Sequence, residues 1–320
     1  YATKPFEYYE GCLTVEFFAF GALHGDAFLV SNENTTVLVD GGMPSTYGEI
    51  TRVIKGKQLD AIFITHVDQD HIGGAIKLLA DSNNDLNGCV VFMNHPELVA
   101  YDDTSLVAYH HGDTLKELAL RRNLTFCPVD VENEVKVGDF FVLVLSPSKS
   151  DVKELHQNWN ASQVIQDGKL TYQERQINNN DIINRSSIAK ILTHDEISLL
   201  LLGDSHPEVI CAKLNSLQYD HDNPIKLDLV KLSHHGSQHS TSPKLLSYLE
   251  CVNYYVSTNG GRYSHPDKET IEMLQGEAQR KNNIYNIYLN YDIESDIRRK
   301  CTIDLPNLRF HFQKKVVLPI

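Results

Sequence analysis

The sequence concentrates potential metal ligands in one short segment, THVDQDHIGG at residues 65–74, directly after the apolar residues 61–65. Four side chains that can bind divalent metal ions lie within six residues: His66, Asp68, Asp70 and His71. At a strand-to-helix turn, where the backbone is neither extended nor helical, such side chains can converge on one ion. Helix capping by an Asp is the competing explanation, but a cap uses one carboxylate and accounts for neither histidine. We therefore expect a metal site here.

Three later segments also place polar side chains directly after expected strands. Asp204 follows residues 197–202, a histidine pair follows residues 227–232, and His265 comes after residues 252–257. Each has a simpler explanation on its own, since an Asp can cap a helix and a His can occupy a turn. The adjacent pair His234 and His235, flanked by Ser and Gly, is the more specific of these signals.

Runs rich in β-branched and aromatic residues alternate with helical stretches along most of the chain. Strands are expected at residues 13–20, 27–30, 37–39, 61–65, 90–93, 124–127, 188–192, 197–202, 227–232 and 252–257, with a hairpin at 135–145. Helices are expected at residues 72–79, 114–122, 207–217 and 243–249, and the last clear one at 267–280. This alternation predicts a layered α/β protein with two packed sheets.

Residues 149–181 are polar and rich in Gln and Asn, and they show no sustained helix or strand pattern. We interpret them as an insertion within a single domain that spans residues 1–320. A connection of this length in a compact fold is usually either functional or disordered, and both alternatives stay open.

Composition limits the function. The chain has 29 Lys and Arg against 42 Asp and Glu, a formal charge of −13, which argues against non-specific coating of duplex nucleic acid. No apolar stretch approaches the roughly 20 residues that cross a bilayer. The six cysteines include no Cys-x-x-Cys pair, which favours reduced thiols and a cytoplasmic protein. Because the chain starts at Tyr1 and not at Met, a removed leader is an open alternative.

Taken in order, the motifs resemble the metallo-β-lactamase superfamily, and within it the hydrolase domain of the competence protein ComEC and its stand-alone relatives. The similar segments are LHGDAF at 23–28, VDGG at 39–42, HVDQDHIGG at 66–74, LGD at 202–204, SHHGS at 233–237 and HP at 265–266. The resemblance covers about residues 13–280. It implies a four-layer αββα sandwich with the site at one edge, where strand-end loops of both sheets meet.

The resemblance also implies a ligand set for two metal ions. His66 and Asp68 would bind the first ion, Asp70 and His71 the second, with Asp204 bridging both and His234 completing the direct ligands. Most of the superfamily has His where Asp68 stands and supplies a further His before the bridging Asp. Residues 184–189 of this chain read NRSSIA and contain no His, so the first ion lacks one protein ligand.

Groups around the ligands receive supporting roles. Asp26 and Asp40 are expected to hydrogen-bond loop amides or ligand histidines. Asp70 can ligate an ion and orient the nucleophile or accept its proton, and His265 can donate to the phosphate or the leaving group. Substrate contacts are predicted for five residues: His235, Lys231, Arg262, Asn184 and Ser187.

Three histidines and three carboxylates suit two divalent ions, and a set this rich in oxygen shifts the preference from zinc towards manganese or magnesium. We expect zinc or manganese, with magnesium as a further option. The leading hypothesis is a metal-dependent phosphodiesterase or nuclease that acts on DNA or a nucleotide-containing substrate. One alternative is a metallohydrolase of a lactone, amide or thioester, which the negative charge keeps open. The other is a non-catalytic subunit that works beside a partner protein in a bacterial defence or DNA-uptake complex.

Overall fold

The computed structural model describes residues 14–95, 108–166, 169–172, 181–261 and 263–319, and two large sheets form its centre. The seven-stranded sheet has the order β19 (Lys315–Pro319), β1 (Thr14–Ala19), β2 (Phe28–Ser31), β3 (Thr36–Val39), β4 (Ala61–Phe63), β5 (Val90–Phe92) and β6 (Thr125–Cys127). The eight-stranded sheet has the order β18 (Leu308–Phe312), β17 (Tyr285–Leu289), β16 (Asn253–Val256), β14 (Leu229–Lys231), β12 (Ile197–Leu201), β11 (Ala189–His194), β8 (Phe140–Ser146) and β7 (Glu134–Val137).

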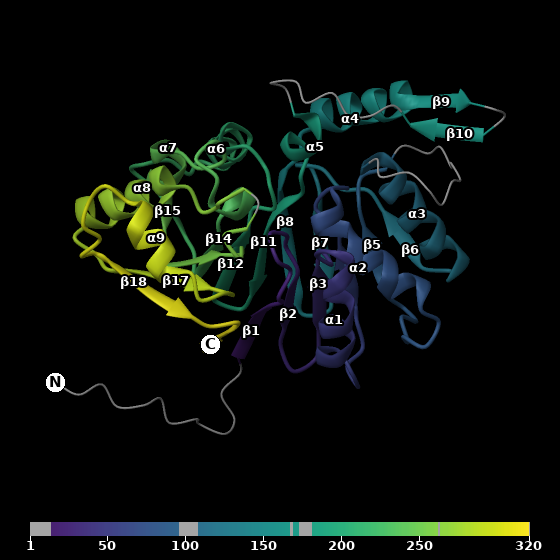
Figure 1. Ribbon diagram of the computed structural model, residues 1–320, viewed down its shortest axis with the longest axis horizontal. Coiled ribbons are helices and arrows are strands. Elements are labelled where there is room, and N and C mark those ends of the chain that lie inside the picture. The colour runs from purple at the N-terminus through teal and green to yellow at the C-terminus, as the bar shows by residue number, and fades with distance from the viewer. Residues whose placement is uncertain (1–13, 96–107, 167–168, 173–180, 262, 320) are drawn as a thin grey trace.

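Helices cover the outer face of each sheet (Figure 1). The seven-stranded sheet carries α1 (Tyr47–Val53), α2 (Gln69–Ala80) and α3 (Ala108–Arg121). The eight-stranded sheet carries α6 (Pro207–Ser216), α7 (Pro243–Ser247), α8 (Lys268–Arg280) and α9 (Glu294–Lys300). A small parallel pair, β13 (Ile225–Lys226) and β15 (Leu249–Glu250), and the short 3-10 helix η1 (Pro44–Thr46) complete these layers.

Three apolar clusters separate the four layers. Phe17, Phe63 and Leu199 belong to the cluster between the two sheets. Neighbouring strand residues that point the other way, such as Ile62 and Leu200, belong to the clusters beneath the helices. Successive side chains of a strand alternate between its two faces. Each central strand therefore contributes to the cluster between the sheets and to the cluster beneath the helices on its own side. The predicted αββα sandwich is confirmed.

Most of the expected elements are confirmed, including the hairpin of β7 and β8. The elements after residue 280 were missed. Residues 267–280 do not hold the last helix, because α9 follows. Strands β17, β18 and β19 come after them, and β19 pairs antiparallel with β1. The exposed positions of β18 and β19 mix charged residues, Arg309 and Lys315, with apolar ones, Phe312 and Val317, so these strands show no clean alternation of polar and apolar residues.

The expectation of no helix or strand in residues 149–181 was also wrong. The segment contains α4 (Lys149–Ser162) and the hairpin of β9 (Gln163–Gln166) and β10 (Lys169–Tyr172), and α5 (Ile182–Arg185) follows it. Figure 1 shows α4 and this hairpin along the top of the fold. Leu155 and Trp159 are buried at helical spacing, whereas most of the other α4 side chains are polar, which hid the periodicity.

Two negative expectations are answered for the part of the chain that the structure covers. Within it, no helix combines the length and the apolar character needed to cross a bilayer. The described cysteines carry free thiols, as predicted: Cys89, Cys127, Cys211, Cys251 and Cys301.

The direction of the strands determines where chemistry can occur. Strands β3 to β6 run parallel, as do β12, β14 and β16 in the other sheet. Because carboxyl ends of parallel strands meet at one edge of a sheet, the loops after β4, β12, β14 and β16 share that edge with their neighbours. These are the loops that carry the conspicuous sequence motifs.

A lysine is fully buried between the sheets. Lys190 of β11 has no exposed surface, and its ammonium group lies 4.9 Å from the ring centre of Phe63. Among the described residues that ammonium has no hydrogen-bond partner. Burial lowers the pKa of Lys190 from 10.5 to about 8, although the carboxylates of Asp40 and Asp26 oppose this shift.

This buried lysine predicts a pH-dependent stability. Between pH 8 and 10.5 the unfolded chain holds the Lys190 proton and the folded chain does not, so this group makes folding more favourable as pH rises. The unfolding free energy of the parent relative to Lys190→Met is expected to rise by roughly 3 kcal/mol across that window. Urea unfolding of both proteins across the window measures it, with the exposed Lys226→Met as control. A parent–variant difference that stays constant with pH contradicts the burial of a neutral amine.

Candidate metal centre

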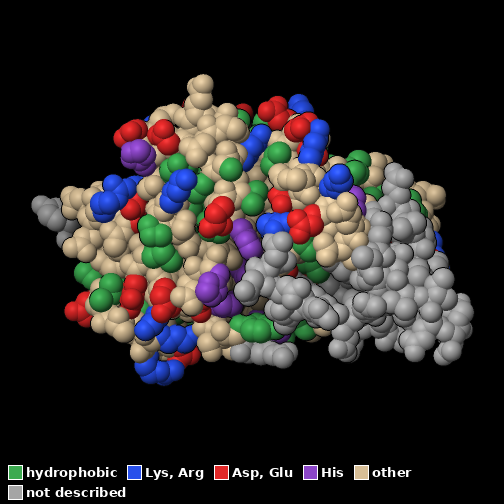
Figure 2. Space-filling model, turned by 90° about the horizontal axis from the view of Figure 1, so that it is seen from above, with side chains coloured by type: hydrophobic (Ala, Val, Ile, Leu, Met, Phe, Trp, Pro, Cys, Tyr) green, Lys and Arg blue, Asp and Glu red, His purple; other side chains and the backbone are tan. Residues whose placement is uncertain are grey.

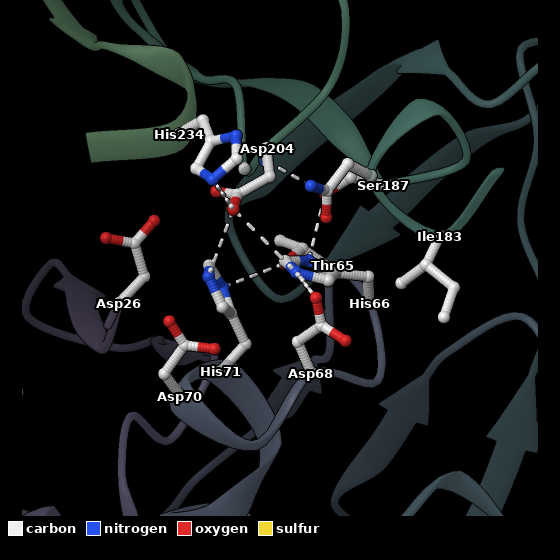
Figure 3. A network of polar contacts seen from close by, with 12 residues as sticks. Asp26, Thr65, His66, Asp68, Asp70, His71, Ile183, Ser187, Asp204 and His234 are labelled. Carbon is white, nitrogen blue, oxygen red and sulfur yellow. Dashed lines mark hydrogen bonds and ion pairs between the residues drawn. The ribbon is translucent and has the colours of Figure 1, made fainter. Parts of the chain in front are cut away.

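Loops from both sheets bring histidines and carboxylates together at the edge of the sandwich. The Nε2 atoms of His66 and His71 lie 3.8 and 3.5 Å from Oδ2 of Asp204. His234 and His235 approach the same oxygen to 3.7 and 3.9 Å. Figure 3 shows the imidazoles of His66, His71 and His234 turned toward Asp204, with Asp68 and Asp70 on the other side of the cluster. Groups of these residues are close enough to share metal ions, among them His66–His71–Asp204 and Asp70–His71–His235.

Helix α2 holds the first motif in place through backbone contacts that only glycine permits. A Cβ on Gly25 would lie 1.9 Å from the carbonyl oxygen of Asp70, and one on Gly74 would lie 2.0 Å from that of Gly41. Asp68 stands at the N-cap of α2, but its side chain makes no capping hydrogen bond. The capping explanation for this carboxylate is therefore wrong.

The histidine pair sits on a strained turn, the 3-10 segment η2 (Ser233–Gly236), which follows β14. His234 and His235 have φ angles of 46° and 55°, in the left-handed region that costs an L-residue roughly 1–2 kcal/mol each. The turn directs the two rings differently. His235 is buried, whereas the His234 side chain keeps 32% of its surface exposed.

Asp40 orients His71 and its loop. One carboxylate oxygen accepts hydrogen bonds from the Thr65 hydroxyl and from Nδ1 of His71, at 2.7 and 2.9 Å. The other oxygen accepts from the Thr65 amide at 2.7 Å. The Nδ1 of His71 is therefore the nitrogen that donates to Asp40, and its Nε2 is the nitrogen available to a metal ion.

The same logic applies to His66. The Thr65 hydroxyl donates its one proton to Asp40, so it accepts from Nδ1 of His66 at 3.0 Å. The hydroxyl of Ser187 also lies 3.3 Å from that nitrogen and accepts from the Asp204 amide. His66 and the loop of Asp204 are thus held by one fully buried serine.

His235 has the third support of this kind. Its Nδ1 lies 2.9 Å from the carbonyl oxygen of Ser257 and 3.2 Å from Asp26, so it donates and leaves Nε2 as the lone pair. The second oxygen of Asp26 accepts from the buried ammonium of Lys231, which also donates to the Gly203 carbonyl. Asp40 hydrogen-bonds a loop amide and His71, as expected, whereas Asp26 pairs with Lys231 and contacts His235.

Several polar atoms that point into this cluster make no hydrogen bond with the described residues. In the described part of the chain, Nε2 of His66, His71 and His235 and Oδ1 of Asp204 are buried without a hydrogen-bond partner. Buried polar atoms are otherwise almost always paired. These four atoms, three of them on imidazoles held through Nδ1, fit a divalent cation of the zinc or manganese type.

The electrostatics favour a positive charge at the same point. Burial alone raises the pKa of Asp204, yet His71, His234 and His235 hold it well below its ordinary value. Burial lowers the pKa of His71, but the carboxylates of Asp204 and Asp40 outweigh it and raise that pKa well above 6.5. For His66 burial dominates and lowers the pKa to about 4, so this imidazole is neutral near pH 7. The carboxylates therefore stabilise a cation here.

Three of the five residues expected to contact substrate are buried and support other groups of the site. Lys231 and Ser187 have no exposed surface and hold Asp26 and His66, while His235 is buried within the cluster. The Asn184 amide donates to Asp181. Arg262 lies outside the described residues. Sequence reasoning could name these residue types but not the direction of their side chains.

Other parts of the site match the sequence more closely. His265 lies at the rim, where its ring centre is 5.6 Å from that of His234 and its Nδ1 is 3.3 Å from Asp267. Sequence analysis missed Thr65 and the Ser257 carbonyl as supports. Their one available signal is position, since Thr65 adjoins His66 and Ser257 ends a strand. Seen from above, histidine side chains reach the surface near the middle of the face (Figure 2).

Comparisons with known proteins agree with this fold. The family model described as the metallo-beta-lactamase superfamily matches residues 20–90. ComE operon protein 3 of Bacillus subtilis (strain 168) is 26% identical over 228 residues, which are 70% of this chain and 23% of that protein. The chain thus spans about a quarter of the length of this curated relative.

Two solved structures are similar over almost the whole chain. CmlA, a diiron β-hydroxylase from Streptomyces venezuelae, has a TM-score of 0.50 at 14% identity, over 98% of this chain and 55% of that one. YhfI, a metallo-beta-lactamase fold protein from Bacillus subtilis, has a TM-score of 0.47 at 10% identity, over 95% and 98%. The family model and the layer order together identify the metallo-β-lactamase fold.

The support of His71 yields a prediction for metal affinity. Both carboxylate oxygens of Asp40 accept hydrogen bonds, from Thr65 and from His71. In Asp40→Asn an NH2 group replaces one of these oxygens, so one acceptor is lost and His71 is less firmly oriented. We expect zinc or manganese affinity, measured by titration calorimetry, to fall roughly 10- to 100-fold. Asp60→Asn is the control, because Asp60 also accepts from a backbone amide, that of Thr36, at 2.8 Å. Equal losses in the two variants contradict a specific role for Asp40.

Proposed function

We propose that this chain, which has the metallo-β-lactamase fold, is a metal-dependent phosphodiesterase or nuclease that acts on DNA or a nucleotide-containing substrate. The observation that carries the proposal is the convergence of three imidazole lone pairs on Asp204, each imidazole held through its Nδ1. Structural histidines of a core use both nitrogens or bury one against apolar groups, whereas ligand histidines leave one free for an ion.

The ligands divide into two overlapping groups. His66 and Asp68 with Asp204 would hold one ion, since Nε2 of His66 lies 3.7 Å from Asp68 and 3.8 Å from Asp204. Asp70, His71 and His235 with Asp204 would hold the other. Zinc or manganese suits such mixed nitrogen and oxygen sets, and magnesium suits them less because of the imidazoles.

His235 is a better ligand than His234 for the second ion. The resemblance assigned this role to His234, whose side chain is one-third exposed and, among the described residues, has no partner at Nδ1. His235 is buried, is held by Ser257 and Asp26, and directs Nε2 toward Asp70 and Asp204 at 3.9 Å each. His234 is then free of metal and can contact the substrate.

The residues can divide the hydrolysis between them. Two bound ions lower the pKa of a shared water and stabilise charge on the displaced oxygen of a phosphodiester. Asp70 retains about a fifth of its side-chain surface, so its carboxylate can accept the proton of the attacking water. His265, held at Nδ1 by Asp267, can donate a proton to the leaving oxygen. Water adds to phosphorus, the ester bond breaks, and a phosphomonoester and an alcohol leave.

The charges of the protein itself do not attract a phosphodiester. The net charge of −13 repels an anion, and the ammonium group of Lys231 is buried against Asp26. Attraction of a phosphate therefore depends on the bound cations. The motif order that resembles the ComEC hydrolase domain, together with the relative named ComE operon protein 3, supports a nucleic acid as the natural source of that phosphate.

The proposal predicts two bound ions per chain and cleavage of single-stranded DNA and of bis-p-nitrophenyl phosphate in zinc or manganese. Asp70→Ala removes a ligand and proton acceptor, so we expect kcat/KM to fall on the order of 10²- to 10⁴-fold. Elemental analysis and initial rates measure both results. Asp85→Ala is the control, because Asp85 is an exposed carboxylate beyond the other end of α2.

The outcomes separate the competing functions. Two ions with no phosphodiester cleavage, but turnover of a lactone or thioester, would replace the proposal with a small-molecule hydrolase. A protein that binds no ion and co-purifies with a partner would point to a non-catalytic subunit. Asp70→Ala with parental activity would contradict the role of Asp70.

The two histidines of η2 are expected to differ. His235→Ala should weaken binding of one of the two ions by roughly 10- to 100-fold or abolish it, because a buried ligand is lost. His234→Ala should keep both ions and lose activity. Metal titration and rate measurements on the two variants test this, and loss of an ion only in His234→Ala would reverse the assignment.

A further inference from the structure

A series of aromatic rings leads from the metal centre to the surface. The rings of His235 and His265 are 6.4 Å apart and nearly parallel at 30°. The next pair, His265 and Tyr263, is stacked at 6.3 Å and 27°, and Tyr263 meets His24 edge-on at 6.0 Å. We call His265, Tyr263 and His24 the ring series.

Exposure increases from His235 through His265 to Tyr263. His235 is 3% exposed, the His265 side chain 14%, and Tyr263 57%. Tyr263 is among the most exposed large apolar or aromatic residues in the described part of the chain, and Leu23 beside His24 is 38% exposed. Tyr263 thus presents an accessible aromatic side chain that stacks on His265 beside the histidine cluster.

The loops that carry these rings are fixed. The amide of Asn259 donates to the carbonyl of Leu23 at 2.8 Å, and the amide of Leu23 donates to the hydroxyl of Tyr291 at 2.9 Å. The Lys300 ammonium donates to the Ser264 carbonyl, next to Tyr263. Loops from the two sheets therefore hold one another, so binding at Tyr263 requires little ordering of the loops that carry it.

We propose that Tyr263, flanked by His24, stacks a nucleobase adjacent to the phosphate held at the metal centre, so that the substrate is a single-stranded nucleic acid or a nucleotide with an accessible base. This inference rests on the proposed phosphodiesterase function and specifies its substrate. One ring, His265, separates Tyr263 from the histidines at the ions, which suits the short span between a phosphate and its own base. Every base has an aromatic face, so the contact selects for unpaired bases and tolerates any sequence. Paired bases in a duplex have no such face to offer.

The test compares a single-stranded oligonucleotide, its duplex, and the same backbone with abasic sites. For the parent, KM should be lowest on the base-bearing single strand. Tyr263→Ala should raise that KM by roughly 5- to 100-fold and bring it close to the abasic value. Tyr263→Phe should restore the preference for bases, since it keeps the ring.

Phe312→Ala is the matched control, because Phe312 is an equally exposed aromatic residue, at 62%, on the edge strand β18. Tyr263→Ala that raises KM equally on base-bearing and abasic strands, or on neither, overturns the inference. Thermal unfolding checks that each variant folds.

Binding separates this inference from the proposed function. Fluorescence anisotropy with a labelled single strand in manganese needs no turnover. If the parent cleaves no phosphodiester but binds the strand, and Tyr263→Ala alone loses that binding by a similar factor, stacking stands and the proposed hydrolysis fails. If the parent cleaves and Tyr263→Ala binds like the parent, hydrolysis stands and stacking fails.

Discussion

The buried ion pair between Asp26 and Lys231 connects the two sheets directly beneath the metal centre, and much of the site depends on it. Asp26 follows the first turn of the seven-stranded sheet, and Lys231 ends β14 of the eight-stranded sheet. Both side chains have no exposed surface. A buried pair costs much of what its attraction returns, so its value lies in what it orients. The free oxygen of Asp26 holds His235, and the second bond of Lys231 holds Gly203, next to Asp204.

This arrangement explains how a strained turn persists. Two consecutive left-handed residues at His234 and His235 need compensation from their surroundings. The buried ring of His235 is bonded to a backbone carbonyl and to Asp26, and the amide of His234 donates to the Gly203 carbonyl at 3.0 Å. One carbonyl, that of Gly203, therefore receives both Lys231 and the strained turn. The position of His235 and that of Asp204 are coupled through it.

Sequence patterns predicted the layered fold and the segments that meet at its edge, because strand periodicity and strand-end His and Asp residues are local signals. They failed where the signal depends on tertiary contacts. Trp159 is buried against His95, at 4.7 Å between ring centres, but its helix is otherwise polar and was taken for irregular chain. Lys231 and Ser187 were placed against substrate because charge and hydroxyl groups suggest it. Only the packing of the sheets shows that they face inward.

The two proposed groups of metal ligands contain different numbers of imidazoles, and hydrogen bonds from Ser187 orient the smaller group. In the proposed assignment the group around Asp70 contains two imidazoles, whereas the group around Asp68 contains one, His66, because residues 184–189 contain no histidine. Ser187 from that stretch does not replace the ligand. It fixes His66 and the amide of Asp204 from behind, at 3.3 and 3.0 Å. In the proposed assignment the ion beside His66 would have fewer protein ligands than the ion beside His71, so it would be bound less tightly and would keep a coordination position for water or substrate. An open position is what a catalytic ion requires and a structural ion lacks.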